Sequence, residues 1–162
     1  MDKKSLLIGI SSQKIERVVH FKVKESSVLL KAIQEAVERE GINNGVIVSG
    51  LGALKEAVFR NLKWFPENFP VKPKDRLYLT VKKPLELVSL GGWIVRRDDG
   101  TPEIHAHFSA STVYDDKVVS LGGHLTEGTI AGIKVVVAIL VLEAGSSLAK
   151  FDESTKSFDI ML

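Results

Sequence analysis

Hydrophobic residues change their period once near the start of the chain. Over residues 16–24 (ERVVHFKVK) they alternate with polar residues, which predicts a strand with Val19, Phe21 and Val23 on one face. Over about 26–40 the apolar residues instead recur every three or four positions, which is the spacing of one helical face. This second segment predicts one amphipathic helix, the main helix of the chain.

The predicted helix has signals at both ends. Ser26 or Ser27 can cap its start, because a serine hydroxyl accepts a hydrogen bond from a free N–H of the first turn. Gly41 can end it in a left-handed conformation. The apolar stripe consists of Val28, Leu29, Ala32, Ile33, Ala36 and Val37. We expect this stripe to pack on the rest of the protein.

The remainder of the chain has the pattern of strands joined by short turns. Turn-forming residues gather at 97–102, 114–117 and 152–156, and short connections between alternating strands favour antiparallel pairing. The expected strands cover residues 45–52, 56–62, 77–83, 85–97, 103–111, 117–125, 132–145 and 156–162. We therefore predict an α+β fold, with one main helix packed on a largely antiparallel, open barrel-like sheet. The length suits a single domain over 1–162.

The run VVVAILVL, residues 135–142, is apolar on both faces of its predicted strand. Such a strand must be covered on both faces, and one helix cannot cover every apolar strand face of this chain. Two arrangements satisfy this requirement. The strand is central in a rolled sheet, or it lies at an interface between subunits.

Composition narrows the chemistry. The chain has no cysteine, which excludes disulfides and thiolate metal sites. A net charge of +2, with both signs interspersed, is weak support for a nucleic-acid partner. The N-terminus lacks the apolar length of a signal peptide, and the longest apolar run is less than half of a membrane span. We expect a cytoplasmic protein with no membrane partner.

Three histidines form the candidate site. In the strand predicted at 103–111 the alternation places His105 and His107 on one face. His124 ends the strand at 117–125, and a hairpin between the two strands could bring it close to the pair. Three imidazoles are the ligand set of many catalytic zinc sites. The alternative is that these histidines are ordinary polar residues on the wet face of a strand.

Other residues carry weaker signals. Gly122 and Gly123 lie within a strand pattern, which suggests a bulge or a close backbone approach near the site. Glu127 and Thr129 follow His124 and could add a carboxylate and a hydroxyl, with Glu127 as a weak catalytic candidate; a solvated turn is the alternative. His20 faces the polar side of the first strand and suits a surface role. The Gly-x-Gly at 50–52 favours a tight turn over a phosphate-binding loop.

Three segments resemble the plants-and-prokaryotes-conserved (PPC) domain. They are GVIVSGLGALKEAVF at 45–59, KPLELVSLGGWIVRRDDGTPEIHAHFSAS at 83–111 and VVSLGGHLTEGTI at 118–130, and the similarity runs over about 15–143. In prokaryotic members of this family a strand with His-x-His precedes a Gly-Gly-His segment. The resemblance implies an α+β domain that assembles as a homotrimer.

The resemblance also implies a function. Some prokaryotic members hold a metal ion, which we expect to be zinc. The positions of this chain that match the metal-binding motif are His105, His107 and His124. In plants the domain follows an AT-hook that binds DNA, and this chain has no Arg-Gly-Arg-Pro for that role. A homotrimeric zinc-binding protein is thus the main hypothesis. A DNA-associated regulator and a metal-dependent enzyme using Glu127 as acid or base are the alternatives.

Overall fold

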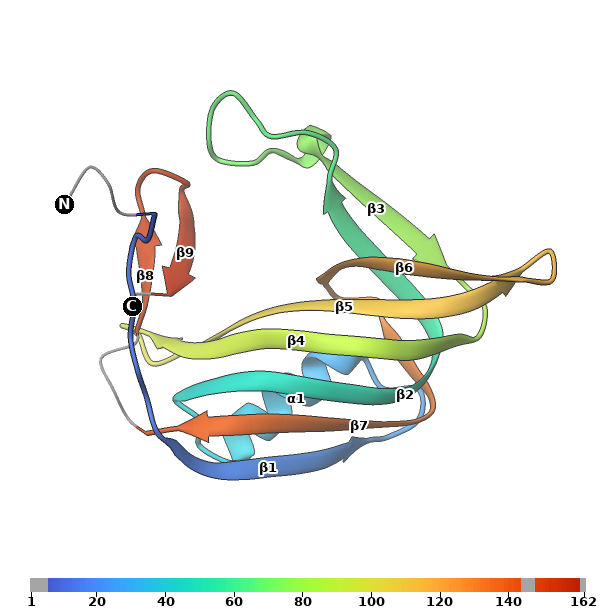
Figure 1. Cartoon of the computed structure of the whole chain (residues 1–162), viewed down its shortest axis with the longest axis horizontal. Helices are drawn as coiled ribbons and strands as arrows, with labels where there is room; N and C mark the ends of the chain where they lie inside the picture. The colour runs from blue at the N-terminus through green and yellow to red at the C-terminus, as the bar shows by residue number, and fades with distance from the viewer. Residues whose placement is uncertain (1–5, 144–147, 161–162) are drawn as a thin grey trace.

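The computed structural model describes residues 6–143 and 148–160, and within these ranges strands predominate around one α-helix (Figure 1). In chain order the elements are β1 (Ile15–Val23), α1 (Leu29–Arg39), β2 (Asn44–Leu62), the 3-10 helix η1 (Pro73–Asp75), β3 (Arg76–Val81), β4 (Leu85–Arg97), β5 (Pro102–Tyr114), β6 (Lys117–Leu125), β7 (Ile130–Leu142), β8 (Leu148–Asp152) and β9 (Ser157–Ile160). The predicted α+β class is confirmed.

The start of α1 differs from the prediction. The helix begins at Leu29, after an N-cap residue, Val28, that makes no side-chain capping bond. The expected caps Ser26 and Ser27 instead pair through their backbones with Ala131, whose carbonyl accepts from the Ser26 N–H at 3.0 Å. The first N–H of the helix, that of Leu29, donates to the Thr129 carbonyl at 2.9 Å, so a backbone oxygen takes the place of a serine hydroxyl there. The end is as predicted, with Gly41 at φ +61°.

The strands expected at 45–52 and 56–62 are one continuous strand, β2. Its first part lies between β7 and β4, and its last part lies between β3 and β6. Register shifts between Ile47 and Ser49, and twice more before Glu56, bend the strand without ending it. The sequence suggested a break because bulges and strand ends share the same glycine-rich signal.

The strands β2, β6, β5 and β4 close a ring, because β2 pairs with both β6 and β4. Pairing is antiparallel throughout this ring. Within the described residues the one parallel pair joins β4 to β8. The β8–β9 hairpin extends the sheet beyond β4, and β2 and β3 together form an arm that projects from the body (Figure 1).

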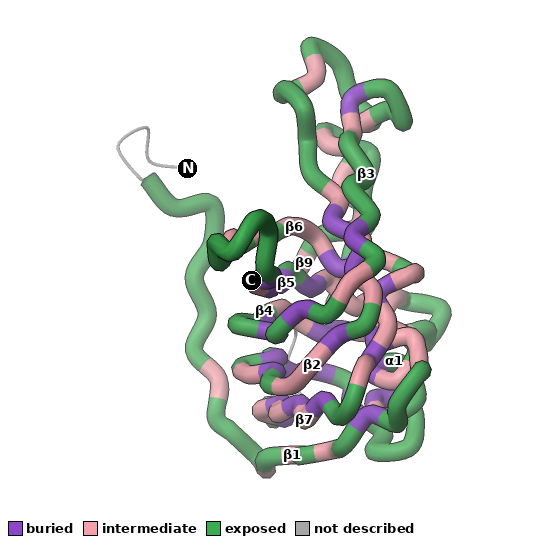
Figure 2. The backbone as a smooth tube through the Cα atoms, turned by 90° about the vertical axis from the view of Figure 1, so that its right-hand side faces the viewer, coloured by how far each residue is buried: buried purple, intermediate pink, exposed green. Residues whose placement is uncertain are grey.

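The hydrophobic core lies between the sheet and α1. Buried positions are concentrated there, whereas the end of the β2–β3 arm is largely exposed (Figure 2). Phe59 and Phe108 stack inside the ring with their centroids 4.8 Å apart. On the helix side, Leu29, Ile33 and Val37 of α1 are fully buried.

The doubly apolar strand at 135–142 lies inside the sheet, between β1 and β2. Its residues Val135, Val137, Ile139 and Val141 are buried on the helix side, and the residues between them are partly covered on the outer side. The strand therefore occupies a central position in the sheet, which is one of the two arrangements expected for it. The outer face of β7 keeps an apolar surface, with the exposed Val18 and Val46 on either side of Leu140.

The C-terminal region contains a strand that the sequence did not predict, β8, and the expected strand at 156–162 corresponds to β9. The strand expected at 132–145 is β7, which runs from Ile130 to Leu142. Residues 144–145 and 161–162 of these predictions lie outside the described residues. No helix in the described part of the chain is long and apolar enough to cross a membrane.

Candidate metal centre

A two-residue turn places His124 opposite His107. Asp115 and Asp116 both have positive φ angles, 46° and 57°, as a type I′ hairpin turn requires. The turn pairs Tyr114 with Lys117, and the ladder continues from there without a bulge to the pair His107–His124. Directly opposed residues of an antiparallel pair point to the same face. The predicted approach of His124 to the other histidines is therefore found.

The three imidazoles converge. Nε2 of His107 lies 3.1 Å from Nε2 of His105 and 3.3 Å from Nδ1 of His124. One ring nitrogen from each of the three lies within 4.8 Å of the other two. All three come from one chain, and His105 and His107 point away from the core, since Ala106 and Phe108, which alternate with them along β5, are buried.

This arrangement fits a metal ion better than a hydrogen-bonded cluster. Two nitrogens bound to zinc at about 2.0–2.1 Å in tetrahedral geometry are roughly 3.3 Å apart, close to the 3.1 and 3.3 Å separations about His107. A ring nitrogen carries either one proton or one lone pair, so the Nε2 of His107 cannot hydrogen-bond well to both neighbours. A cation between the rings would take up the lone pair of each of the three nitrogens.

The environment keeps the imidazoles neutral, which is the form that binds metals. Burial, and then the positive charge of Arg60, lower the pKa of His124 to about 3. Burial also lowers the pKa of His107, with a further contribution from Arg60. For His105, burial and then His107 lower the pKa, while Glu103 and Asp159 oppose the shift.

An aromatic wall and an open hollow flank the cluster. The ring of Trp93, directly opposite His105 on β4, stacks on that imidazole with centroids 5.1 Å apart. On the other side, Gly91 lies opposite His107 and leaves space where a side chain would stand. A shallow hollow of about 520 Å³ begins there and is lined by Val48, Ser89, Leu90, Gly91, His107, Phe108 and Ser109. Access to His107 is therefore open.

Sequence reasoning missed Arg60. It lies directly opposite His124 on the neighbouring strand β2, and Tyr78 of β3 lies on its other side. Arg60 is one of several charged residues in a strand pattern, and nothing in its neighbourhood along the sequence marks it as part of a site. The pairing of β2 with β6, which alone brings this arginine to the histidines, has no local signal in the sequence.

The remaining candidates lie elsewhere. Glu127 is exposed and lies 3.9 Å from Lys31 of α1, on the helix side of the sheet. Thr129 is fully buried and its hydroxyl oxygen accepts a hydrogen bond from the Val58 N–H at 3.1 Å, a structural contact. His20 is exposed on β1, opposite Ala138. None of the three belongs to the histidine cluster of the described residues.

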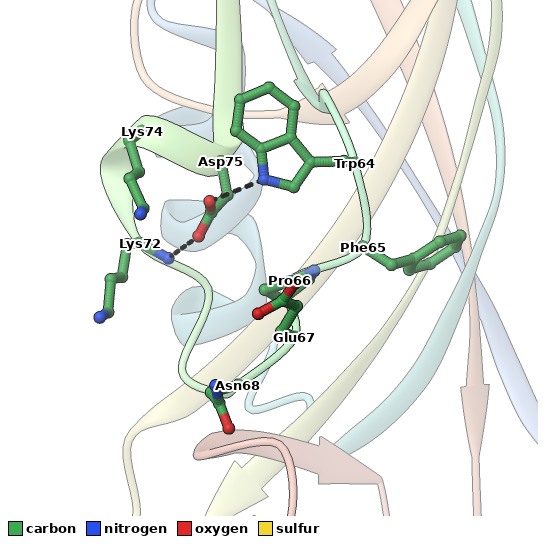
Figure 3. A pocket seen from close by; sticks show the side chains of 8 residues that line it. All are labelled: Trp64, Phe65, Pro66, Glu67, Asn68, Lys72, Lys74 and Asp75. Carbon is green, nitrogen blue, oxygen red and sulfur yellow. Dashed lines mark hydrogen bonds between the residues drawn. The ribbon is translucent and has the colours of Figure 1, made fainter.

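A second hollow, of about 490 Å³, lies at the end of the β2–β3 arm (Figure 3). Its organising group is the buried Asp75, whose carboxylate accepts hydrogen bonds from Trp64 Nε1 at 2.9 Å and from the Lys72 N–H at 2.8 Å. The Lys72 bond is the main reason that the pKa of Asp75 is lowered. Because both bonds close the loop onto itself, Asp75 has a structural role.

An antiparallel sheet with a cluster of three imidazoles on its outer face, backed by one helix, defines the class: an α+β domain with a candidate metal centre. Residues 10–143 match the Plants and Prokaryotes Conserved (PCC) domain, so the chain belongs to this family. The family expected from the sequence, there called PPC, is thereby confirmed.

Solved structures agree with the fold. A metal-containing protein from Archaeoglobus fulgidus is similar over 96% of this chain and 100% of its own, with 23% identity and a TM-score of 0.73. A PPC protein from Pyrococcus horikoshii is similar over 96% and 99%, with 25% identity and a TM-score of 0.72. A candidate DNA-binding protein from Bacteroides thetaiotaomicron is similar over 93% and 96%, with 18% identity and a TM-score of 0.70. No curated protein matches the chain in sequence.

Proposed function

We propose that this protein binds a metal ion through His105, His107 and His124, and that the ion is Zn²⁺. The observation that carries the proposal is the convergence of three ring nitrogens from one chain, with separations of 3.1 and 3.3 Å about His107. An all-imidazole set without cysteine favours Zn²⁺ over Ca²⁺ or Mg²⁺, which prefer oxygen ligands. The similarity to a metal-containing protein supports the same function.

The number of ligands bears on what the site can do. Three protein ligands are the number found in catalytic zinc sites, whereas structural sites commonly use four. A zinc ion held in this way supplies Lewis-acid chemistry. The histidines of this chain would hold the ion, with Trp93 stacked on His105 on one side and the His107 side open through the hollow at Gly91. The metal-dependent enzyme thus stays an alternative, without Glu127 as a neighbour of the site.

Elemental analysis of protein purified without a polyhistidine tag tests the proposal. We expect about one zinc per chain in the wild type and less than a tenth of this in a variant with His105→Ala and His107→Ala. His20→Ala is the matched control, because His20 is an exposed strand histidine outside the cluster, and it should keep the full metal content. Equal metal content in all three proteins would refute the assignment.

We also propose that the assembly is a homotrimer, which buries the outer face of β7. Across that face Leu140 lies between Val18 of β1 and Val46 of β2, and these two valines are 50% and 36% exposed. Sedimentation equilibrium should give three times the chain mass. Val46→Lys should reduce that mass, whereas Val118→Lys, on the distant β6, should not. A monomeric wild type would contradict the proposal.

DNA association is the second candidate. Lys63, Lys72 and Lys74 lie near the exposed Trp64 and Phe65 at the end of the β2–β3 arm, a combination of charge and aromatic surface that suits nucleic acid. Binding of a labelled duplex should then weaken steeply with salt, and replacing the three lysines with glutamine should reduce the slope. Absence of binding at low salt would remove this candidate.

The single-domain organisation over 1–162 and the cytoplasmic location stay predictions.

A further inference from the structure

Arg60 belongs to a row of side chains that crosses the sheet into the histidine cluster. In this row Tyr78, Arg60, His124 and His107 lie opposite one another on β3, β2, β6 and β5. Directly opposed residues share a face and neighbouring strands are about 5 Å apart, so the guanidinium emerges beside the imidazole of His124. The lowering of all three histidine pKa values by Arg60 is consistent with this proximity.

Among the described residues the positive charge of Arg60 has no acidic partner. Arg60 is half-buried, and neither it nor Arg76 takes part in an ion pair with any described residue. Its neighbours are a second cation, Arg76, and the side chain of Tyr78. Burial and then the charge of Arg76 lower the pKa of Arg60, yet a guanidinium stays protonated at neutral pH.

From this geometry we infer that Arg60, aided by Arg76 and Tyr78, binds the oxyanion group of a small molecule, a carboxylate or a phosphate, beside the three histidines. The planar fork of a guanidinium matches both groups in a two-point contact. An anion there would neutralise a half-buried cation that the chain itself leaves unpaired. The inference deepens the proposed function and rests on it for one point, that the ligand also lies within reach of the metal.

A small ligand fits the site better than a nucleic-acid backbone. Arg60 is a half-buried cation on one sheet face, whereas DNA binding uses many exposed phosphate contacts. The lysines at the end of the arm are exposed and lie beyond this row. The open space at Gly91, on the far side of His107, gives room for the rest of a small ligand.

Calorimetric titration of inorganic phosphate and of acetate into metal-free protein, at constant ionic strength, tests the inference. We expect Arg60→Gln to weaken the binding of the preferred anion at least tenfold, and Arg60→Lys to weaken it less, because lysine keeps the charge but loses the fork. Arg39→Gln is the matched control. It removes one positive charge from an exposed helical arginine paired with Glu35, and binding should not change.

A spectroscopic arm reports whether the anion lies at the metal. In protein loaded with Co²⁺, the visible spectrum should change on adding the anion to the wild type and should change far less in Arg60→Gln. Anion binding unaffected by Arg60→Gln would overturn the inference. So would a loss of binding to a short DNA duplex in this variant with no loss of binding to either small anion.

The two proposals can fail separately. Metal content that meets the expectation above, together with Arg60-independent anion binding, refutes the anion site and leaves the metal site standing. Arg60-dependent anion binding in a protein that takes up no metal does the reverse. Circular dichroism of Arg60→Gln and Arg60→Lys, compared with the wild type, shows whether each variant is folded before either result is counted.

Discussion

The backbone of His105 runs directly against Gly92 of β4. A Cβ atom built on Gly92 would lie 2.2 Å from the carbonyl oxygen of His105 and 2.7 Å from the Cα of Ala106. These backbone atoms cannot move without displacing the strand that carries two of the three histidines. The glycine is therefore part of what positions the candidate metal centre.

We predict that Gly92→Ala costs roughly 1–3 kcal/mol of unfolding free energy, because overpacking against backbone has no easy relief. Gly91→Ala is the matched control, since a Cβ there would meet its nearest atom at 3.8 Å, and its cost should stay within about 0.5 kcal/mol. Urea unfolding of both variants provides the measurement. Equal stability of the two variants would contradict the packing described here.

The turn between β5 and β6 offers a stabilising change. Asp116 has φ 57°, a left-handed conformation that costs an L-residue about 1 kcal/mol and glycine almost nothing. Asp116→Gly should therefore raise the unfolding free energy by up to about 1 kcal/mol. Asp98→Gly, in a turn without positive φ at that residue, should not raise it. Thermal unfolding of both variants tests this, and a stabilisation by Asp98→Gly alone would refute the reasoning.

Acid should destabilise the metal-free protein. Burial lowers the pKa of His124 to about 3 in the folded state, against 6.5 as its ordinary value. Below pH 6.5 the unfolded chain then binds more protons than the folded one, so stability falls as pH falls from 6.5 towards 3. Melting temperatures measured in chelator from pH 7.5 to 4.5 should decrease, and less steeply for His124→Asn. A flat profile for the wild type would contradict the expected neutral imidazole.

The stacked pair inside the ring makes a large contribution to stability. Phe59 is 1% exposed and its ring lies almost parallel to that of Phe108, at 13°. Phe59→Ala should cost about 3–5 kcal/mol, the usual range for a buried phenylalanine. Phe65→Ala, at a residue 90% exposed, should cost less than about 0.5 kcal/mol. Chemical denaturation of the two variants compares a core position with a surface position of the same residue type.

The parts predicted well from sequence are those fixed by local patterns. The alternation of side chains around Ala106 correctly predicts that His105 and His107 share a face of the strand. The position of Gly41 correctly predicts the end of α1. The turn at 114–117 was also predicted. A two-residue hairpin turn at this place fixes the pairing register of β5 and β6. His107 is seven residues before Tyr114 and His124 is seven residues after Lys117, so the two histidines must lie opposite each other.

The parts that were missed depend on contacts between distant segments. Arg60 reaches His124 only because β2 continues through its bulges to pair with β6. The serine caps failed for a similar reason, since the carbonyl of Thr129, about a hundred residues away, accepts the first N–H of α1. No short window of sequence contains either pairing, whereas periodicity and turn chemistry are read within ten residues.

The continuity of β2 also has a consequence for motion. The strand joins β6 through only two residue pairs, Phe59–Leu125 and Arg60–His124, whereas it joins β4 and β7 through many more. Local opening is cheap where few backbone bonds are lost. We expect the ring to open first at the β2–β6 junction, so amide protons there should exchange with solvent sooner than those in the middle of β7. The ring thus has a weak seam directly beside the candidate centre.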